Sequence, residues 1–410
     1  MNCGVQRWSS ISRTRFRAAH AALALSMFLV RVFLAPQAAQ AQGYSEAVLY
    51  IFQGTANHDG SNPAAPLIRD SAGNLYGTTY YGGVGNGTVF KLDPSGTETI
   101  LYTFPGGKRG AHPSGGLVRD GAGNFYGVTF AGGTAGGGTV FKLSKAGRES
   151  VLHSFTGTGG DGIKPMGSLI RDSAGNLYGT TSQGDAGTCQ YGTVFKLDPS
   201  SKETVLYCFA GVQGDGRNPS AGLVRDSVGN LYGTTYSGGT QGEGFGTVFK
   251  IDPSGKETVL HNFPATASDG ENPAAALIRD SAGNLYGTTY AGGGGFGSDG
   301  TVFKVDPSGT ETVLLSFGTS GGGSRPLGGL IRDSAGNLYG TTSGHTQSDG
   351  GTAFELAPGG SVTVLHAFTP LTGDGSSPQA GLVPDSAGNL YGTTYLGGEW
   401  GKGTVFELTP

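Results

Sequence analysis

Short runs of alternating apolar and polar residues follow one another along most of the chain, separated by turn residues. In the first complete copy, the runs cover residues 66–70, 75–80, 88–93 and 99–104, and we name them strands A to D. They are rich in the β-branched and aromatic residues that strands favour. Asp70-Ser-Ala-Gly-Asn74 separates A from B and Asp93-Pro-Ser-Gly96 separates C from D, and both are typical tight-turn sequences. The pattern therefore predicts two tight hairpins, A–B and C–D.

This unit recurs at intervals of 50 to 54 residues, with the aspartate that begins the first turn at Asp70, Asp120, Asp172, Asp226, Asp280, Asp333 and Asp385. A period of this length indicates a repeat architecture, and four antiparallel strands repeated seven times predict a seven-bladed β-propeller. The last copy ends on a strand C, residues 403–410. Its missing strand D matches residues 46–52 at the other end of the chain. We therefore expect an all-β ring that the N-terminal strand closes.

The first 41 residues differ from the repeats. Arg7, Arg13, Arg15 and Arg17 precede an apolar run at residues 21–30, and Ala39-Gln-Ala41 is a small-x-small cleavage site. This is the pattern of a secretory signal peptide. We expect a leader at 1–41, one propeller domain at 42–410, and export to the periplasm or the extracellular space. The alternative is an uncleaved membrane anchor, but an apolar run this short does not span a bilayer.

Charge narrows the choice of partners. The leader holds five of the 26 basic residues and none of the 30 acidic ones, so residues 42–410 carry 21 basic against 30 acidic residues, a net charge of −9. Nucleic acids and anionic membranes bind through clustered positive charge. We therefore expect no nucleic-acid partner and no stable membrane span after leader cleavage, and we expect the chain to be a monomer.

The strand order also predicts where a ligand would bind. Both tight turns lie on one face of the ring, whereas the long, variable B–C and D–A loops share the opposite face. Binding residues are more often found on such variable loops. The candidates for a ligand-binding site on these loops are Trp400, Phe245, Phe296, Glu243, His345 and Glu399. Trp400 could stack on a sugar ring or instead pack between blades.

The chain shows no motif of a known catalytic or metal site. Five D–A loops contain an Asp-Gly pair, with the aspartates at Asp59, Asp161, Asp215, Asp269 and Asp374. A ring of carboxylates near a central channel could hold calcium, but Asp-Gly is also ordinary turn chemistry. His153, His261 and His366 occupy a strand D position that is tyrosine in other copies, so we interpret them as packing residues. We expect no catalytic residue, no metal and no cofactor.

Other repeated positions predict contacts. The lysines of strand C and the glutamates of strand D, such as Lys91 and Glu98, are placed to pair across the C–D hairpin. The glycine inside strand B, such as Gly77, indicates a bulge or a close approach by a neighbouring element. Arginines at the end of strand A, such as Arg69, are expected to brace the blades. Cys189 and Cys208 belong to one blade and should form a disulfide in an exported protein.

The repeat as a whole resembles a known bacterial repeat. Leu67-Ile-Arg-Asp-Ser-Ala-Gly-Asn-Leu-Tyr-Gly-Thr-Thr79, then Gly87-Thr-Val-Phe-Lys-Leu-Asp-Pro-Ser-Gly96, is similar to the GloVer tandem repeat. The resemblance covers about residues 46–410. It implies an exported bacterial protein of the choice-of-anchor type, although we expect no C-terminal anchor in this chain. It implies no catalytic residues.

These features together favour a non-catalytic binding or interaction protein outside the cytoplasm, with a glycan or another protein as its ligand on the variable-loop face. Two alternatives stay open. One is a carbohydrate-active hydrolase or lyase with its acid and base on the variable loops, and the other is a structural component of the cell envelope. A fold of this kind does not by itself decide among them.

Overall fold

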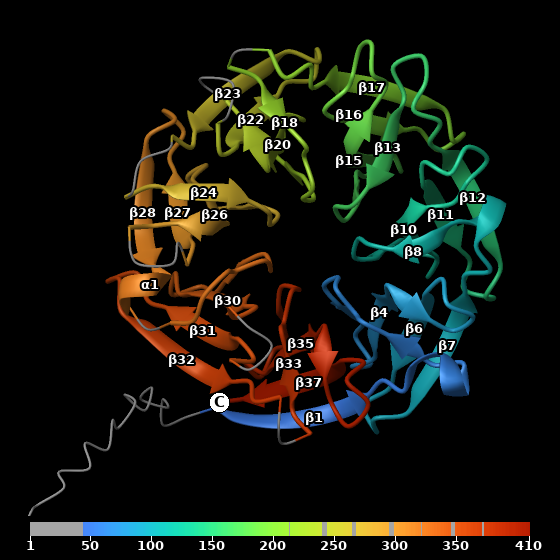
Figure 1. Cartoon of the computed structure of the whole chain (residues 1–410), viewed down its shortest axis with the longest axis vertical. Helices are drawn as coiled ribbons and strands as arrows, with labels where there is room; N and C mark the ends of the chain where they lie inside the picture. The colour runs from blue at the N-terminus through green and yellow to red at the C-terminus, as the bar shows by residue number, and fades with distance from the viewer. Residues whose placement is uncertain are drawn as a thin grey trace, which may run out of the picture. The chain divides into compact units, whose positions relative to one another are not determined.

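The computed structural model describes residues 44–212, 214–239, 244–264, 268–294, 299–320, 322–345, 349–370 and 373–410. These residues form seven antiparallel sheets of four or five strands arranged in a ring, a seven-bladed β-propeller (Figure 1), and three two-stranded sheets in the loops. The predicted all-β propeller is therefore confirmed. The predicted leader lies outside the described residues. Within the described ranges, no helix has both the length and the apolar character needed to cross a bilayer.

The two outer strands of each blade match the predicted C and D runs. The strands C are β6 (Thr88–Leu92), β11 (Thr139–Leu143), β16 (Thr193–Leu197), β22 (Thr247–Ile251), β27 (Thr301–Val305), β31 (Thr352–Leu356) and β37 (Thr404–Thr409). The outermost strands D are β1 (Ser45–Ile51), β7 (Glu98–Thr103), β12 (Glu149–Ser154), β17 (Glu203–Cys208), β23 (Glu257–Asn262), β28 (Glu311–Ser316) and β32 (Val362–Ala367).

The two inner strands of each blade follow the predicted A and B runs, with very short A strands. The strands B are β4 (Leu75–Thr79), β10 (Phe125–Ala131), β15 (Leu177–Gly184), β20 (Leu231–Thr235), β26 (Leu285–Gly292), β30 (Leu338–Thr342) and β35 (Leu390–Thr394). The strands A are β3 (Ile68–Arg69), β9 (Val118–Arg119), β14 (Ile170–Arg171), β19 (Val224–Arg225), β25 (Ile278–Arg279), β29 (Ile331–Arg332) and β34 (Val383–Pro384). We number the blades 1 to 7 in the order of their A strands.

Short pieces in the D–A and B–C loops complete the structure. The additional strands are β2 (Gly60–Ser61), β5 (Tyr81–Gly82), β8 (Ala111–Pro113), β13 (Gly162–Pro165), β18 (Gly216–Arg217), β21 (Ser237–Gly238), β24 (Gly270–Pro273), β33 (Gly375–Ser376) and β36 (Leu396–Gly397). The helical turns are α1 (Phe317–Ser320) and the 3-10 turns Gly54–Asn57 and Gly107–Arg109.

The ring closes as the sequence predicts. Strand β1 lies antiparallel to β37 and becomes strand D of blade 7 (Figure 1), with Ser45 opposite Thr409 and Ile51 opposite Thr404. The pairing continues in a hydrogen bond from the Phe52 amide to the Gly403 carbonyl, 3.0 Å long. Strand β1 thus covers an edge of the last sheet that would otherwise be exposed.

The C–D hairpin differs from the prediction by one residue. Gly96 adopts a positive φ of 80°, and Asp93 pairs with Thr97 through a 3.0 Å hydrogen bond, so the loop contains three residues. Lys91 therefore lies opposite Thr99, and Glu98 lies opposite Leu92. The predicted direct lysine–glutamate pairing across this hairpin is wrong. The glutamate faces the neighbouring blade instead.

Adjacent blades meet at seven boundaries, which we call seams and name by the blades on either side (seam 7/1, seam 1/2 and so on). At each seam, a phenylalanine that follows strand D packs edge-on against a strand C phenylalanine of the next blade, as Phe52 does against Phe90 with 5.2 Å between ring centroids. A Cβ atom at Gly77 would lie 2.7 Å from the Phe90 ring. The strand B glycine is therefore required by a close approach, one of the two predicted reasons.

The repeated aspartate also joins neighbouring blades. Asp70 accepts hydrogen bonds from the Asn74 amide and from the Tyr76 hydroxyl of its own blade, and Arg119 of blade 2 lies 3.6 Å from its carboxylate and over the Tyr76 ring. Burial alone would raise the pKa of the equivalent Asp120, but hydrogen bonds from Asn124 and Tyr126 outweigh it and lower this pKa to about 2. The predicted bracing role of the arginines is confirmed.

Candidate functional site

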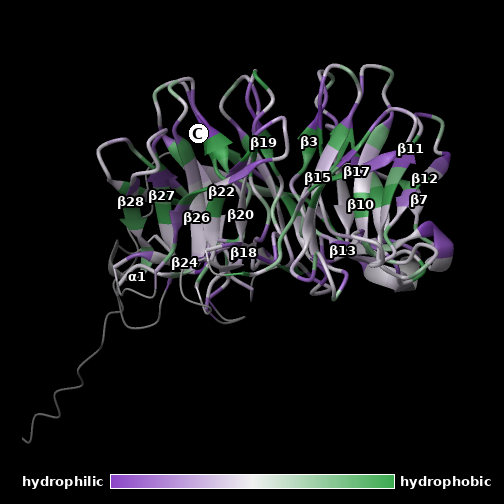
Figure 2. Ribbon diagram, turned by 90° about the horizontal axis from the view of Figure 1, so that it is seen from above, coloured by the Kyte–Doolittle hydropathy of each residue, from purple (hydrophilic) through white to green (hydrophobic). Residues whose placement is uncertain are grey.

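The ring encloses a cavity on its axis. Its volume is about 800 Å³, and every blade contributes to its wall. One lining residue from each blade, in chain order, is Ala64, Ser114, Met166, Ser220, Ala276, Leu330 and Gln379. These residues precede or begin the strands A, so the cavity lies on the side of the variable loops. In Figure 2 that side is the lower edge, where β13, β18 and β24 lie.

Small residues allow seven segments to approach the axis. A Cβ atom at Gly167 would collide with the backbone of Ala221 in the next blade. Side-chain hydroxyls tie neighbouring segments together, since Ser168 accepts a 2.8 Å hydrogen bond from the Gly116 amide and Thr180 donates a 2.9 Å hydrogen bond to the Ala221 carbonyl. The cavity wall is therefore held in shape by contacts between blades.

Aromatic side chains surround the mouth of this cavity. The residue that follows the Gly-Thr-Thr or Gly-Val-Thr of each strand B is aromatic in five of the seven blades, in the order Tyr80, Phe130, Ser182, Tyr236, Tyr290, Ser343 and Tyr395. Tyr80, Ser182, Tyr236 and Tyr395 line the cavity itself. Tyr236 remains 37% exposed. We call these seven residues the aromatic rim.

A second ring of side chains alternates with the aromatic rim. Its members hold positive φ angles between 54° and 59° and each precedes a proline, in the order Asn62, His112, Lys164, Asn218, Asn272, Arg325 and Ser377. His112 stacks on Tyr80 with ring centroids 4.8 Å apart. Lys164 lies over the Phe130 ring. Neither ring contains a carboxylate, so the mouth of the cavity is aromatic, amide-rich and weakly basic.

The loop residues predicted as a ligand site do not line this cavity where the structure describes them. Trp400 is 56% exposed, and its neighbour Glu399 is also exposed, on the B–C loop of blade 7. Phe245 packs against the buried cluster around Val248, and its carbonyl accepts a 2.7 Å hydrogen bond from the Asn272 amide of the next blade. Phe245 therefore stabilises a seam. Phe296 and Glu243 lie outside the described residues.

Two further predictions concern loop contacts. His345 contacts the Asp299 carboxylate of the preceding blade, and its amide donates a 2.7 Å hydrogen bond to Asp349. A binding role for His345 stays a prediction. Cys189 and Cys208 form a disulfide with Cα atoms 4.7 Å apart, as predicted. It joins the B–C loop of blade 3 to the end of β17.

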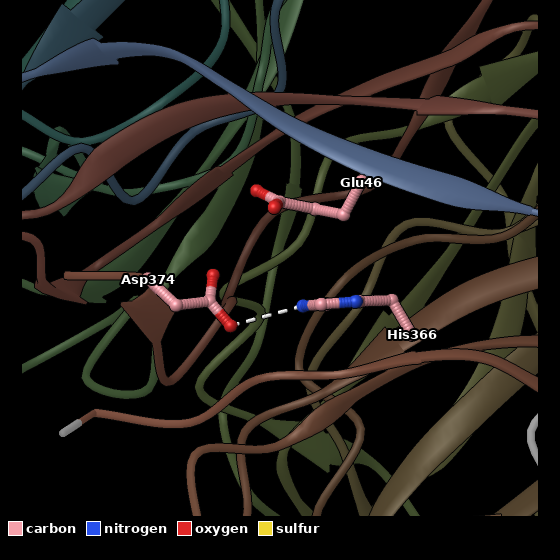
Figure 3. A group of neighbouring side chains, drawn as sticks. All are labelled: Glu46, His366 and Asp374. Carbon is pink, nitrogen blue, oxygen red and sulfur yellow. Dashed lines mark hydrogen bonds and ion pairs between the residues drawn. The ribbon is translucent and has the colours of Figure 1, made fainter. Parts of the chain in front are cut away.

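A polar trio lies at most seams near the outer strands. It comprises a tyrosine or histidine of strand D, the aspartate of the following Asp-Gly pair, and the glutamate that begins strand D of the next blade. Figure 3 shows one trio, in which His366 Nε2 lies 3.0 Å from Asp374 Oδ2 and Glu46 of β1 faces both. None of the Asp-Gly aspartates lines the axial cavity. They do not form the carboxylate ring near the channel that the sequence allowed.

Burial raises the pKa of the glutamates in these trios. Loss of solvent around each carboxyl, and then the charge of the nearby aspartate, raise the pKa of Glu98 and of Glu257 from 4.5 to about 7. Burial is also the main cause that raises the pKa of Glu203 and of Glu311 to about 7. The trios are thus unusual electrostatic sites at an otherwise apolar boundary between blades.

Comparison with known proteins shows the family to which the chain belongs. The family model described as the Gloeobacter/Verrucomicrobia repeat matches residues 37–189, 82–298 and 165–406. No curated protein matches the sequence.

Among solved structures, the extracellular domain assigned to the hybrid two component system BT3049 of B. thetaiotaomicron aligns with a TM-score of 0.57 and 12% identity over 90% of this chain and 41% of that one. The corresponding domain of BT4673 from the same organism aligns with a TM-score of 0.57 and 13% identity over 89% and 39%. The chain thus spans about two fifths of the length of these structures. At this identity, the likeness shows the propeller fold alone.

Proposed function

Since the chain belongs to the Gloeobacter/Verrucomicrobia repeat family, we propose that it is an exported, non-catalytic binding propeller whose ligand enters the axial cavity. The observation that carries this proposal is the cavity of about 800 Å³ with aromatic residues at its mouth. Small-molecule sites in proteins have volumes of roughly 300–1,000 Å³ and are mostly apolar with a few polar groups. The Cys189–Cys208 disulfide supports export, because disulfides persist in oxidising compartments.

The chemistry of the cavity favours an oligosaccharide as the ligand. Tyr80, Tyr236 and Tyr395 offer aromatic faces on which a sugar ring can stack, and Gln183 and Asn218 offer amides for hydroxyl groups. Among the described residues, none that lines the cavity is an aspartate, glutamate, histidine or cysteine. The described part of the wall therefore offers no carboxylate pair of the kind that a glycoside hydrolase needs. This composition supports a binding role over the hydrolase or lyase alternative.

A thermal-shift and calorimetric screen against a panel of oligosaccharides tests this proposal. A ligand at 100 times its Kd is expected to stabilise the protein by about 2.7 kcal/mol. Tyr236→Ala should weaken binding about tenfold, because a lost aromatic stack is worth roughly 1–1.5 kcal/mol. Trp400→Ala is the matched control, since it removes an exposed aromatic residue that lies outside the cavity, and it should leave the affinity unchanged.

The opposite results are equally informative. An affinity that depends on Trp400 and is insensitive to Tyr236 would place the ligand on the variable loops. A panel without any hit would contradict the glycan and leave a protein ligand or a structural role. Shortened sugars after prolonged incubation would favour the hydrolase or lyase.

A further inference from the structure

We propose that three of the seams are metal sites, each binding one divalent transition-metal ion through a histidine, an aspartate and a glutamate. These histidine trios are His153, Asp161 and Glu203 at seam 2/3, His261, Asp269 and Glu311 at seam 4/5, and His366, Asp374 and Glu46 at seam 6/7. In each trio, one ligand atom from every residue lies within 4.8 Å of the other two. This inference is independent of the axial cavity.

At seams 2/3 and 4/5, the spacing of the donor atoms is close to that around a bound ion. His153 Nε2 lies 3.4 Å from Asp161 and 3.7 Å from Glu203. His261 Nε2 lies 3.5 Å from Asp269. Zinc binds nitrogen and carboxylate oxygen at roughly 2.0–2.2 Å with tetrahedral geometry, which separates two ligands by about 3.3–3.6 Å. A direct N–H···O hydrogen bond is shorter, near 2.9 Å, and His366 Nε2 and Asp374 Oδ2 at seam 6/7 lie at such a distance, so these two side chains would move apart to admit an ion.

Buried atoms in the trios also lack partners that an ion would supply. At seam 4/5, no described residue offers a hydrogen bond to His261 Nε2 or to Glu311 Oε1, and both atoms are buried. The Oε1 atoms of Glu46 and Glu203 lack a partner in the same way, but so do those of Glu98, Glu149 and Glu257 at seams without histidine, so the atom that distinguishes a histidine seam is His261 Nε2. Buried polar atoms of folded proteins are almost always satisfied, so such exceptions indicate an unseen water or ion.

The other seams provide internal comparisons. Where the histidine is a tyrosine, its hydroxyl donates a hydrogen bond to the aspartate, as from Tyr207 to Asp215 at 3.2 Å. A tyrosine can only donate its proton to the carboxylate at this place, whereas Nε2 of a neutral histidine donates in one tautomer, as toward Asp161 and Asp374, and offers a lone pair to an ion in the other. At seam 1/2, which has no Asp-Gly aspartate, the cationic guanidinium of Arg109 lies 3.1 Å from Glu149. A positive charge therefore already occupies the corresponding place in a seam without histidine.

The donor set indicates which ion fits. The imidazole suits zinc and similar transition metals, and it disfavours magnesium and calcium, which prefer oxygen ligands. The two carboxylates accept either class of ion, so the imidazole decides the selectivity. Three protein ligands leave a fourth tetrahedral position for water. At seam 6/7, the ion would tie Glu46 of β1 to blade 6 (Figure 3), so metal binding would strengthen the closure of the ring.

The test is a zinc titration of the protein after dialysis against a chelator, read by calorimetry and by competition with a chromophoric chelator. We expect three Zn²⁺ ions per chain and a rise in Tm that EDTA reverses, with no such rise in MgCl₂. His153→Tyr, His261→Tyr and His366→Tyr should each remove one ion, and the triple variant should bind none. These variants copy tyrosine seams that the chain already builds at Tyr50 and Tyr207, so they are expected to fold.

A gain of function sharpens the test. Tyr207→His places a histidine beside Asp215 and Glu257 and should create a fourth site. His345→Ala is the control for histidines elsewhere, and it should leave three ions bound. The proposal fails if the unsubstituted protein binds no zinc, if the triple variant binds as many ions as the unsubstituted protein, or if Tyr207→His adds none.

Discussion

Seam 5/6 and seam 3/4 are built from the same strands of the repeat, but the side chains that meet there are apolar at seam 5/6 and polar at seam 3/4. At seam 5/6, Leu315 and Val362 pack within one apolar cluster. At seam 3/4, Tyr207, Asp215 and Glu257 occupy the same place with polar groups. The phenylalanine pairs beside them are almost identical, with centroids 5.1 Å apart at seam 5/6 and 5.2 Å apart at seam 3/4.

This comparison separates the contacts that every seam shares from the contacts that only some seams have. The phenylalanine pair and the strand B glycine recur at both seams, so they hold the blades together. The polar trio is absent from seam 5/6, where the blades pack equally well. A trio is therefore not needed to join two blades, and it is available for other tasks such as binding an ion or responding to pH.

Removal of strand β1 should have the largest effect, because it breaks seam 6/7 and seam 7/1 together. Deletion of residues 44–52 also removes Phe52, which is fully buried. We expect the Tm, measured by circular dichroism, to fall by roughly 10 °C or more. A synthetic peptide of residues 44–53 added to the truncated chain should partly restore it. An unchanged melting curve would contradict the closed ring.

A polar group at the apolar seam should have the next largest effect. Leu315 is 5% exposed, and Asn at this position would find no trio to pair with. Leu315→Asn should lower the free energy of unfolding by about 2–4 kcal/mol, measured by urea denaturation. Val228→Asn, at a position 72% exposed, is the control and should change stability by less than about 0.5 kcal/mol. Similar losses for both variants would show that the apolar seam tolerates polarity.

The polar seam should make stability depend on pH. The pKa of Glu257 is raised from 4.5 to about 7 in the folded protein, so folding favours its protonated form. The contribution of Glu257 to stability is therefore complete below about pH 4.5 and is lost as the pH rises through about 7. Glu257→Gln removes a charge that only the protein at high pH carries. Its effect on the free energy of unfolding should therefore be more favourable at pH 8 than at pH 5, by on the order of 1 kcal/mol after discounting for the partial exposure of Glu257.

The apolar seam supplies the control for this experiment. Val362→Ala should lower stability by the same amount at pH 5 and at pH 8, because its seam contains no titrating trio. If Glu257→Gln has the same effect at both values, Glu257 is not the titrating group.

The smallest expected effect tests the register of the C–D hairpin. Lys250 lies opposite Thr258, and Glu257 lies opposite Ile251. A double-mutant cycle of Lys250→Ala with Glu257→Gln should therefore give a coupling energy below about 0.3 kcal/mol. The cycle of Tyr207→Phe with Glu257→Gln should give a larger value, because these side chains meet across the seam. The reverse order would support the direct lysine–glutamate pair.

The sequence predicts the fold well because its signals are local and repeated. Each hairpin is specified by its own turn, and a last copy without strand D indicates which segment closes the ring. The register error has a physical cause, since Gly96 in the left-handed region adds one residue to the loop. That single residue turns Glu98 from its own hairpin toward the preceding blade, where Tyr50 and Asp59 lie.

The candidate sites are harder to predict because they combine residues about 50 positions apart. The aromatic rim can be recognised in the sequence as the residue after Gly-Thr-Thr. That residue lies at the end of strand B, whereas we predicted the ligand site on the variable loops. The sequence does contain one sign of the trios. The position that is tyrosine or histidine in the other copies is Leu315 in one copy, and the glutamate position that it would contact is Val362 in the following copy. Recognising that change as a contact requires the neighbouring blade, which the sequence of one repeat does not contain.

The staggered closure by β1 has a consequence for how such rings change over evolutionary time. The repeat unit encoded in the chain runs from strand A to strand D, and blade 7 takes its strand D from the other end. A duplication or loss of one whole unit in the gene would therefore add or remove one whole sheet, and the same two ends would still meet. Ring size can then change by recombination between the repeated copies while every blade keeps its four strands.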